Sequence, residues 1–273
     1  MEIKVLLEND KERKEYEQAH GLSLYIEALG RKILFDFGPG EEFIRNADKM
    51  DINIGEIDFA ILSHGHIDHG GGLPYFLEVN EKAPVYMHPK ALEPHYSSRE
   101  DGIMNHIGLP ENFKNSKRII YKEGINWINE NMALISYVHE EMMMPPGNET
   151  LYREEYEEFV LDDFSHEQNL LINEENVLVL FTGCGHRGVL NIMESVKTLV
   201  GRYPDHVVGG FHLKKPSKNN PDETYVPRLA KELKSRGAKY YTCHCTGPKM
   251  YAVLEETLDD DVKYIVTGSD VHI

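Results

Sequence analysis

Four side chains that can bind metal lie within six residues of one another, in the stretch from Ser63 to Gly72. They are His64, His66, Asp68 and His69. Imidazole and carboxylate are ligands that zinc, iron and manganese accept at neutral pH. The alternative is a surface loop that happens to be rich in histidine, but with 14 histidines in 273 residues the pattern is rare by chance. The glycines that end the stretch would let the backbone turn tightly around an ion. The stretch therefore predicts a metal site.

A buried strand must position this stretch. The apolar run Ile57–Leu62 precedes it directly and is typical of a strand. Because alternate residues of a strand point the same way, we expect His64 and His66 to face one metal ion. Asp68 and His69, beyond the bend, would then face a second ion.

The second half of the chain repeats a unit of strand, turn and helix. The expected strands are Val177–Thr182, His206–Phe211 and Ala238–Cys243, and the helices that follow them are Gly188–Val200, Glu223–Arg236 and Lys249–Leu258. A histidine stands where each strand ends, which is where open α/β sheets hold their ligands. We interpret His186 and His244 as further metal ligands. His212 is either a ligand or an acid near the leaving group.

The other expected elements complete an α/β protein. They are the strands Ile3–Leu7, Leu22–Leu29, Lys32–Phe37, Pro84–His88, Arg118–Tyr121, Met132–Val138 and Lys263–Thr267, and the helices Glu41–Lys49 and Leu73–Val79. Gly30-Arg31 would form a two-residue hairpin turn, and Lys263–Thr267 would be the last strand. The segments Lys90–Asn115 and Glu140–Glu158 are irregular. No linker divides the chain, so we expect residues 1–273 to form a single domain.

The remaining histidines have weaker settings. His166 precedes a strand and is either a ligand or a cap. The others are expected to be structural or exposed: His88, His95, His106 and His139.

Three cysteines complete the set of candidate donors. Cys184 shares a strand face with His186, and a thiolate there would change the choice of metal or the redox behaviour. Cys243 and Cys245 flank His244, and on a strand they would point away from the face that His244 uses, so we expect them to pack in the core.

Two expected helix starts could bind an anionic group. Thr246 and Gly247 follow His244 and expose backbone N–H groups of the kind that hold phosphate. Arg187 follows His186 in the same way. Positive charge nearby would come from Arg187, Lys214, Lys215 and Lys249, each of which could equally be an ordinary surface residue. We predict that Arg187, Thr246, Gly247 and His212 contact the substrate.

Composition excludes several classes of partner. The net charge of −17 argues against nucleic acid, because phosphate backbones are bound by clustered Lys and Arg. No apolar stretch approaches membrane-spanning length and no signal peptide is visible. Three cysteines do not suggest a disulfide framework. We therefore expect a cytoplasmic protein whose partner is a small anionic substrate, with no nucleic acid and no membrane. A homodimer is compatible with the sequence.

The motif His64-x-His66-x-Asp68-His69, after an apolar strand and the earlier turn Asp36-x-Gly38, resembles the signature of the metallo-β-lactamase superfamily. The resemblance implies a four-layer αβ/βα sandwich with a two-metal site. By this resemblance, the metal ligands would be His64, His66, Asp68, His69, His186 and His244. His212 would contact the substrate. The segments 181–188, 209–213 and 244–247 are similar to the branch that contains an archaeal pterin-biosynthesis synthase. The superfamily usually has a bridging aspartate after the strand that here ends at His186, and this segment contains none.

These observations favour a hydrolase with two divalent ions, zinc first and iron or manganese as alternatives. The substrate would be a small phosphate or diphosphate ester, with Asp68 orienting the nucleophile and His212 protonating the departing oxygen. One alternative is a transferase that joins a dihydropterin diphosphate to an aromatic amine with loss of diphosphate. A second is a metal-binding redox protein without hydrolytic activity.

Overall fold

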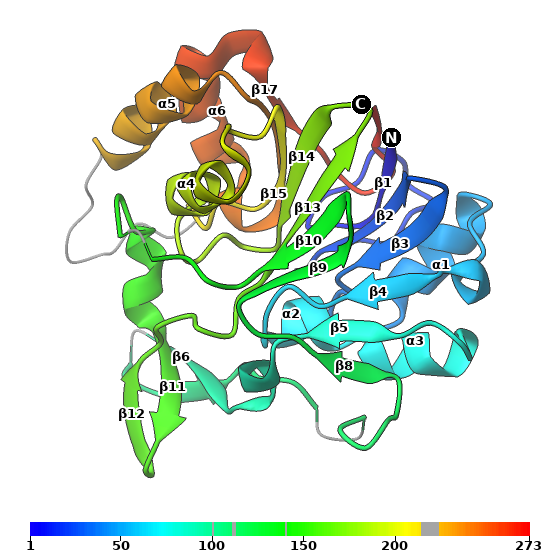
Figure 1. Ribbon diagram of the computed structural model, residues 1–273. Coiled ribbons are helices and arrows are strands. Elements are labelled where there is room, and N and C mark those ends of the chain that lie inside the picture. Colours follow the sequence, from blue (N-terminus) through cyan, green and yellow to red (C-terminus); the bar gives the residue numbers. More distant parts are fainter. Residues whose placement is uncertain (100, 111–112, 140, 214–223) are drawn as a thin grey trace. The chain divides into compact units, whose positions relative to one another are not determined.

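The computed structural model describes residues 1–99, 101–110, 113–139, 141–213 and 224–273. The chain forms two compact units (Figure 1). Unit 1 comprises Met1–Glu123, Tyr152–Val160 and Val266–Ile273, and unit 2 comprises Gly124–Leu151 and Leu161–Ile265. The chain passes between the units several times, so neither unit is one continuous segment. That residues 1–273 form a single domain stays a prediction.

The main sheet of unit 1 has the strand order β18-β1-β2-β3-β4-β5-β8. Its strands are β1 (Glu2–Leu7), β2 (Ser23–Ala28), β3 (Arg31–Phe35), β4 (Phe59–Ile61), β5 (Val85–Met87), β8 (Ile119–Tyr121) and β18 (Asp270–His272). Strands β3, β4, β5 and β8 are parallel to one another, while β18, β1, β2 and β3 pair antiparallel. The carboxyl ends of β3 and β4 therefore lie side by side at one edge of the sheet.

The described residues of unit 1 form three short α-helices, of which the first and the third pack on its main sheet. They are α1 (Glu42–Lys49), α2 (Ile67–Gly70) and α3 (Leu73–Val79). Phe43 of α1 and Phe76 of α3 pack with Leu34 and Val85 of the sheet in one buried apolar cluster. A second, smaller sheet consists of β12 (Glu158–Leu161), β11 (Leu151–Glu155), β6 (His95–Ser98) and β7 (Met104–His106), and it belongs to unit 1 apart from the boundary residues Leu151 and Leu161.

The sheet of unit 2 has the strand order β17-β16-β15-β14-β13-β10-β9. Its strands are β9 (Ile125–Asn129), β10 (Met132–Ile135), β13 (Asn169–Glu174), β14 (Val177–Thr182), β15 (His206–Gly209), β16 (Lys239–Thr242) and β17 (Val262–Tyr264). Strands β14 to β17 are parallel. The helices α4 (Val189–Val200), α5 (Tyr225–Arg236) and α6 (Pro248–Leu258) pack on one face of it through an apolar cluster. The predicted repeat of strand, turn and helix is confirmed.

Several details of the prediction are wrong. The hairpin turn is Leu29-Gly30, one residue earlier than expected, and both residues have positive φ. The last strand is β18, close to the C-terminus, and it pairs with β1 near the N-terminus. Lys263–Thr267 is therefore not the last strand. The segments expected to be irregular contain β6, β7, β11 and part of β12, whose largely polar and half-exposed residues give no alternating apolar signal.

Candidate metal centre

Unit 1 gathers three buried imidazoles, which we call the imidazole cluster: His64, His66 and His69. The ring centroids of His64 and His66 are 4.5 Å apart, and those of His64 and His69 are 4.2 Å apart. Three imidazole rings this close, all away from solvent, are a donor set suited to a cation. The predicted grouping of these histidines is therefore found within one unit.

The segment after β4 positions His64 and His66 in a different way from the one expected. Strand β4 ends at Ile61, so strand alternation does not position His64 and His66. His66 instead stands at the N-terminus of the short helix α2, and His69 lies within that helix. The glycines that follow do not supply a left-handed turn. Gly72 has φ of −77°, and a Cβ there would lie 2.2 Å from the carbonyl oxygen of Phe37, so glycine is needed for close packing.

A fully buried carboxylate, Asp36, orients the imidazole cluster. Asp36 follows β3, and its Oδ1 accepts the backbone N–H of Ser63 at 2.7 Å. Its Oδ2 lies 2.6 Å from Nδ1 of His69. Because a carboxylate can only accept, Nδ1 of His69 carries the proton and Nε2 carries the lone pair that a metal requires.

The same carboxylate reaches His64 through Ser63. The hydroxyl of Ser63 donates to Asp36 Oδ2 at 2.7 Å. Its oxygen is therefore left to accept from Nδ1 of His64, 2.8 Å away. Asp36 thus fixes two imidazoles as Nε2 donors, and the earlier turn Asp36-x-Gly38 was the only sequence signal for this role.

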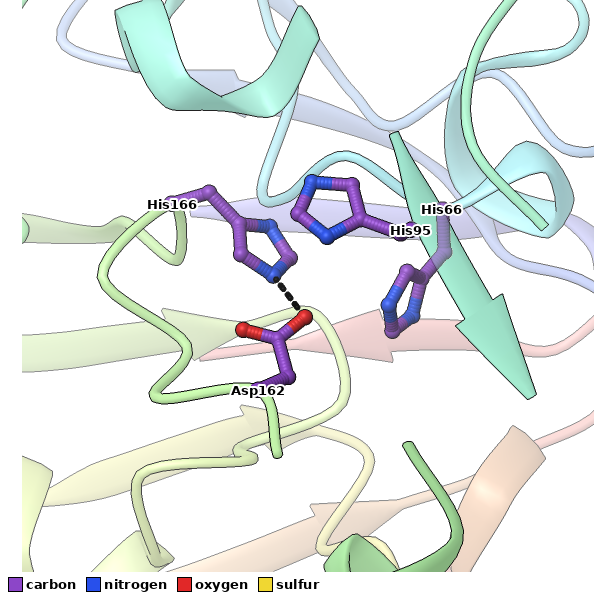
Figure 2. Close-up of side chains that lie close together, drawn as sticks. All are labelled: His66, His95, Asp162 and His166. Atoms are coloured by element: carbon purple, nitrogen blue, oxygen red, sulfur yellow. Dashed lines mark hydrogen bonds and ion pairs between the residues drawn. The ribbon is translucent and has the colours of Figure 1, made fainter. Parts of the chain in front are cut away.

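His95, expected to be structural or exposed, is fully buried, with its ring centroid 5.6 Å from that of His66 (Figure 2). Backbone pairing brings the two together. The N–H of Ile67 donates to the carbonyl of Ile107 at 2.7 Å, and the N–H of Ile107 donates to the carbonyl of His95 at 2.8 Å. No local sequence pattern predicts this backbone pairing of Ile107 with Ile67 and His95.

Asp68 is half-buried at the edge of the imidazole cluster. Its Oδ2 lies 3.3 Å from Nε2 of His20 and 4.0 Å from Nε2 of His69. A carboxylate in this place is close enough to the ligand nitrogens to bind the same ion. Its predicted roles as a ligand and as the orienting group stay predictions.

Unit 2 gathers a second donor set, which we call the thiol–imidazole cluster: Cys184, His186, His212, His244 and Cys245. These residues follow the carboxyl ends of β14, β15 and β16, which are adjacent parallel strands. Donor atoms of Cys184, His186 and His212 lie within 4.8 Å of one another, and so do those of Cys184, His244 and Cys245. The strand-end histidines His186 and His212 lie close together, with ring centroids 4.2 Å apart, while their roles stay predictions.

The expectation that Cys245 points away from His244 is wrong. It assumed that the strand continues to Cys243, whereas β16 ends at Thr242 and His244–Thr246 form a 3-10 turn. His244 has φ of +51°, so the chain reverses and strand alternation no longer applies. The thiol of Cys245 thereby joins Cys184, which the sequence had placed near His186.

His186 is oriented by an amide, Asn148, which the sequence did not single out. Nδ2 of Asn148 donates to the carbonyl of His186 at 2.7 Å, which directs Oδ1 toward Nδ1 of the ring at 3.2 Å. Nδ1 is therefore the protonated nitrogen and Nε2 the donor. The ring also stacks on Phe164, with centroids 4.5 Å apart and planes 5° from parallel.

A buried carboxylate supports the same turn through the backbone. Glu167 accepts the N–H of His186 at 2.7 Å and the N–H of Arg187 at 3.0 Å. Burial raises the pKa of Glu167 to about 7, although these two hydrogen bonds favour its ionised form. Burial also acts to raise the pKa of Cys245, but contact with Cys184 and with the imidazoles of His212 and His244 lowers that pKa well below its usual value.

His166 lies in unit 2 with its Nε2 3.2 Å from Oδ2 of Asp162, and both side chains are buried (Figure 2). No helix begins at His166, since the next element is the strand β13. The two alternatives for His166, a ligand or a cap, both stay open.

The residues predicted to contact substrate have structural partners. The guanidinium of Arg187 donates to the carbonyls of Val138 at 2.9 Å and Asp163 at 3.2 Å. The buried hydroxyl of Thr246 lies 2.6 Å from that of Thr242 and accepts the N–H of Phe211 at 3.0 Å. Both side chains thus hold loops in place, and their contact with substrate stays a prediction.

Gly247 has φ of +72° and precedes α6, as expected for a helix start. Lys249 is exposed on that helix. Lys214 and Lys215 lie outside the described residues. Within the part of the chain that is described, Nδ1 of His212 has no hydrogen-bond partner.

The fold and both donor sets identify the chain as a member of the metallo-β-lactamase superfamily, whose family model matches residues 18–191. The chain is 27% identical to Tm1679, a metal-dependent hydrolase of the β-lactamase superfamily, and its structure matches that crystal structure with a TM-score of 0.84 over 100% of this chain and 99% of that one. The predicted α/β metallo-β-lactamase-like sandwich is confirmed as a fold class.

Two proteins of the archaeon Methanocaldococcus jannaschii are similar over most of the chain. One is 7,8-dihydropterin-6-methyl-4-(beta-D-ribofuranosyl)-aminobenzene-5'-phosphate synthase, 29% identical over 91% of this chain and 88% of its own length. The other is an uncharacterized protein, 30% identical over 93% of this chain and 94% of its own length. Within the described residues, no helix is both long and apolar enough to cross a membrane.

The donor chemistry fits divalent metal. His64, His69 and His186 each hold the proton on Nδ1 through an acceptor in their own unit, which leaves Nε2 as the coordinating atom in all three. This is the arrangement in which metal-binding histidines are usually held. The residues therefore suit the ions that the superfamily uses.

Proposed function

We propose that this protein is a metal-dependent hydrolase of a small anionic substrate, a phosphate or diphosphate ester. The proposed ligands are His64, His66, Asp68 and His69 of unit 1 and His186 and His244 of unit 2, for two divalent ions with zinc first and iron or manganese as alternatives. The observation that carries the proposal is the fixed tautomer of His64 and His69, set by the buried Asp36. Membership in the superfamily supports it.

Bound divalent ions supply Lewis acidity and bring the pKa of a coordinated water to about 7. The residues of the chain then have separate tasks. Asp36 keeps two donor nitrogens aimed while remaining buried itself. Asp68, half-buried, accepts a hydrogen bond from the attacking nucleophile and orients it. His212 donates a proton from its ring to the departing oxygen, and its Nδ1 is available for this among the described residues.

A second candidate function is transfer of a dihydropterin to an aromatic amine, with diphosphate as the leaving group. The observation that favours it is the similarity to the archaeal synthase, which extends over 91% of this chain. The two candidates share the substrate class and the residues above. They differ in the nucleophile, which is water in one and an amine in the other.

One experiment separates the candidates. The metal-loaded protein is given a panel of phosphate and diphosphate esters, including dihydropterin diphosphate, in heavy-oxygen water, with and without an aromatic amine. A hydrolase releases products that carry the heavy oxygen, and the amine changes nothing. A transferase forms the amine conjugate instead. Protein that holds metal but turns over none of these esters would contradict both.

The setting of the activity is also proposed. We propose that the protein acts in the cytoplasm on a small molecule, without nucleic acid or membrane as partners. The acidic composition supports the part of this proposal that concerns nucleic acid. A homodimer is compatible with this proposal, and sedimentation of the metal-loaded protein would test it.

A further inference from the structure

Two of the three cysteines meet in unit 2. Cys184 is 3% exposed and Cys245 is 5% exposed, and neither forms a disulfide. Their sulfur atoms and one ring nitrogen of His244 lie within 4.8 Å of one another. Two sulfurs and one imidazole at this separation match the ligand types of a tetrahedral zinc site with one position open.

The surrounding backbone leaves room for one of these sulfurs. A Cβ on Gly210 would lie 2.4 Å from Sγ of Cys245 and 2.9 Å from the carbonyl oxygen of Gly183. Any residue other than glycine at this position would therefore displace the thiol. The absence of a side chain at Gly210 is thus what lets Cys245 approach Cys184 and His244.

The sulfur of Cys245 also has backbone partners, since its thiol can donate to the carbonyl oxygen of Cys184 at 3.5 Å. The backbone N–H of His212 donates to Sγ of Cys245 at 3.2 Å. Hydrogen bonds to a coordinating sulfur orient it and offset its negative charge, as partners of ligands do in metal sites. The thiol of Cys245 is therefore placed as a ligand would be, rather than surrounded only by apolar side chains.

We propose that Cys184 and Cys245 bind a metal ion through sulfur, with His244 as the imidazole ligand. The inference rests on the proposed metal-dependent function, because His244 belongs to that ligand set. It deepens that function by assigning the class of metal. Thiolates select zinc, cobalt or iron over manganese and magnesium, which prefer oxygen ligands. The ion of unit 2 is then held more by soft donors than the superfamily motif alone implies.

The test uses the whole protein loaded with cobalt(II) in place of its native metal. Sulfur bound to cobalt gives an intense charge-transfer band in the near ultraviolet, whereas nitrogen and oxygen ligands do not. We expect the band in the wild-type protein. In Cys184→Ser and Cys245→Ser it should fall by about half each, since each variant removes one of two sulfurs, and the double variant should lose it. Cys243→Ser is the matched control, because Cys243 is buried beside His244 but is not one of the three donors.

A second measurement needs no variant. X-ray absorption at the zinc edge should show sulfur at about 2.3 Å in addition to nitrogen at about 2.0 Å. Wild-type protein that holds cobalt or zinc with nitrogen and oxygen ligands only would overturn the sulfur proposal and leave the proposed function intact. Protein that takes up neither ion would overturn both. A band that Cys243→Ser reduces as much as Cys184→Ser does would also contradict the assignment.

Discussion

The two donor clusters lie at equivalent places in their units but are supported by different chemistry. In unit 1 the imidazole cluster stands past β4 and is tied to one buried carboxylate, Asp36, directly and through Ser63. In unit 2 the thiol–imidazole cluster stands past β14, β15 and β16, and His186 is oriented by a neutral amide. Hydrogen bonds to a charged acceptor are roughly twice as strong as those between neutral groups. Unit 1 should therefore hold His64 and His69 more firmly in their metal-binding tautomer than unit 2 holds His186.

The largest effect should come from removing a ligand of the imidazole cluster. His64→Ala removes a ring whose centroid lies 4.5 Å from that of His66 and 4.2 Å from that of His69. We expect metal content and turnover to fall together, the latter by more than about 10³-fold, because metals supply several kcal/mol of the rate acceleration. Elemental analysis and steady-state kinetics measure this. His139→Ala, an exposed histidine of unit 2, is the control and should change neither. Full activity in His64→Ala would break the assignment.

Asp36→Asn tests the support of unit 1 without removing a ligand. The amide places an N–H group where Oδ2 accepts from His69 and Ser63, or else turns its N–H group toward the backbone N–H of Ser63. We expect the affinity for zinc to fall by about 10–100-fold. Asn46→Ala is the matched control, since Asn46 is equally buried in unit 1 and bonds only the backbone of Leu6 and Glu17. Equal losses in both variants would mean that Asp36 acts only on stability.

Asn148→Ala makes the corresponding change in unit 2. It releases Nδ1 of His186 from a neutral acceptor. The loss of zinc affinity should be about tenfold, at the low end of the range for such partners. Competition of each variant against a coloured chelator ranks the two directly. A loss in Asn148→Ala larger than that in Asp36→Asn would reverse the proposed order of the two clusters.

Glu167 gives an effect of a different kind, a dependence of stability on pH rather than of metal affinity. Its pKa is raised to about 7 by burial, above the ordinary value of 4.5, so the folded state binds a proton that the unfolded state releases. The stability that this group contributes is present below about pH 4.5 and is lost as pH rises through about 7. In chelator-treated protein, the free energy of unfolding of the wild type relative to Glu167→Gln should fall by about 3 kcal/mol over that interval. Urea titrations at several pH values measure it, and a relative gain with rising pH would contradict the sign.

Local patterns were enough to predict most of the parallel half of each unit. Strand β14 and helix α3 have the predicted bounds, because each combines a dense apolar pattern with clear breaks on either side. Strand β18 could not be predicted, because only Val271 of its three residues is buried and its partner β1 lies at the other end of the chain.

The residues of the candidate site also divide into those that the sequence could predict and those that it could not. Histidine types and spacing were sufficient to predict that His64, His66 and His69 lie together, as their ring distances show. The partners that orient His186 were not identified by spacing, since Asn148 and Glu167 are distant in sequence and their role exists only in three dimensions. Cys245 was misassigned because the chain leaves β16 one residue before the pattern suggests, and a positive φ at His244 turns it.

The central claim is that His64, His69 and His186 are held in a tautomer that binds divalent cations. Purified protein, stripped with chelator and titrated with zinc in a calorimeter, tests it most directly. We predict tight binding of two ions per chain, with little proton release from the imidazoles, which already present unprotonated Nε2 atoms, and with release from the thiols that become ligands. Protein that remains free of zinc, and of manganese and iron in parallel titrations, would contradict the account.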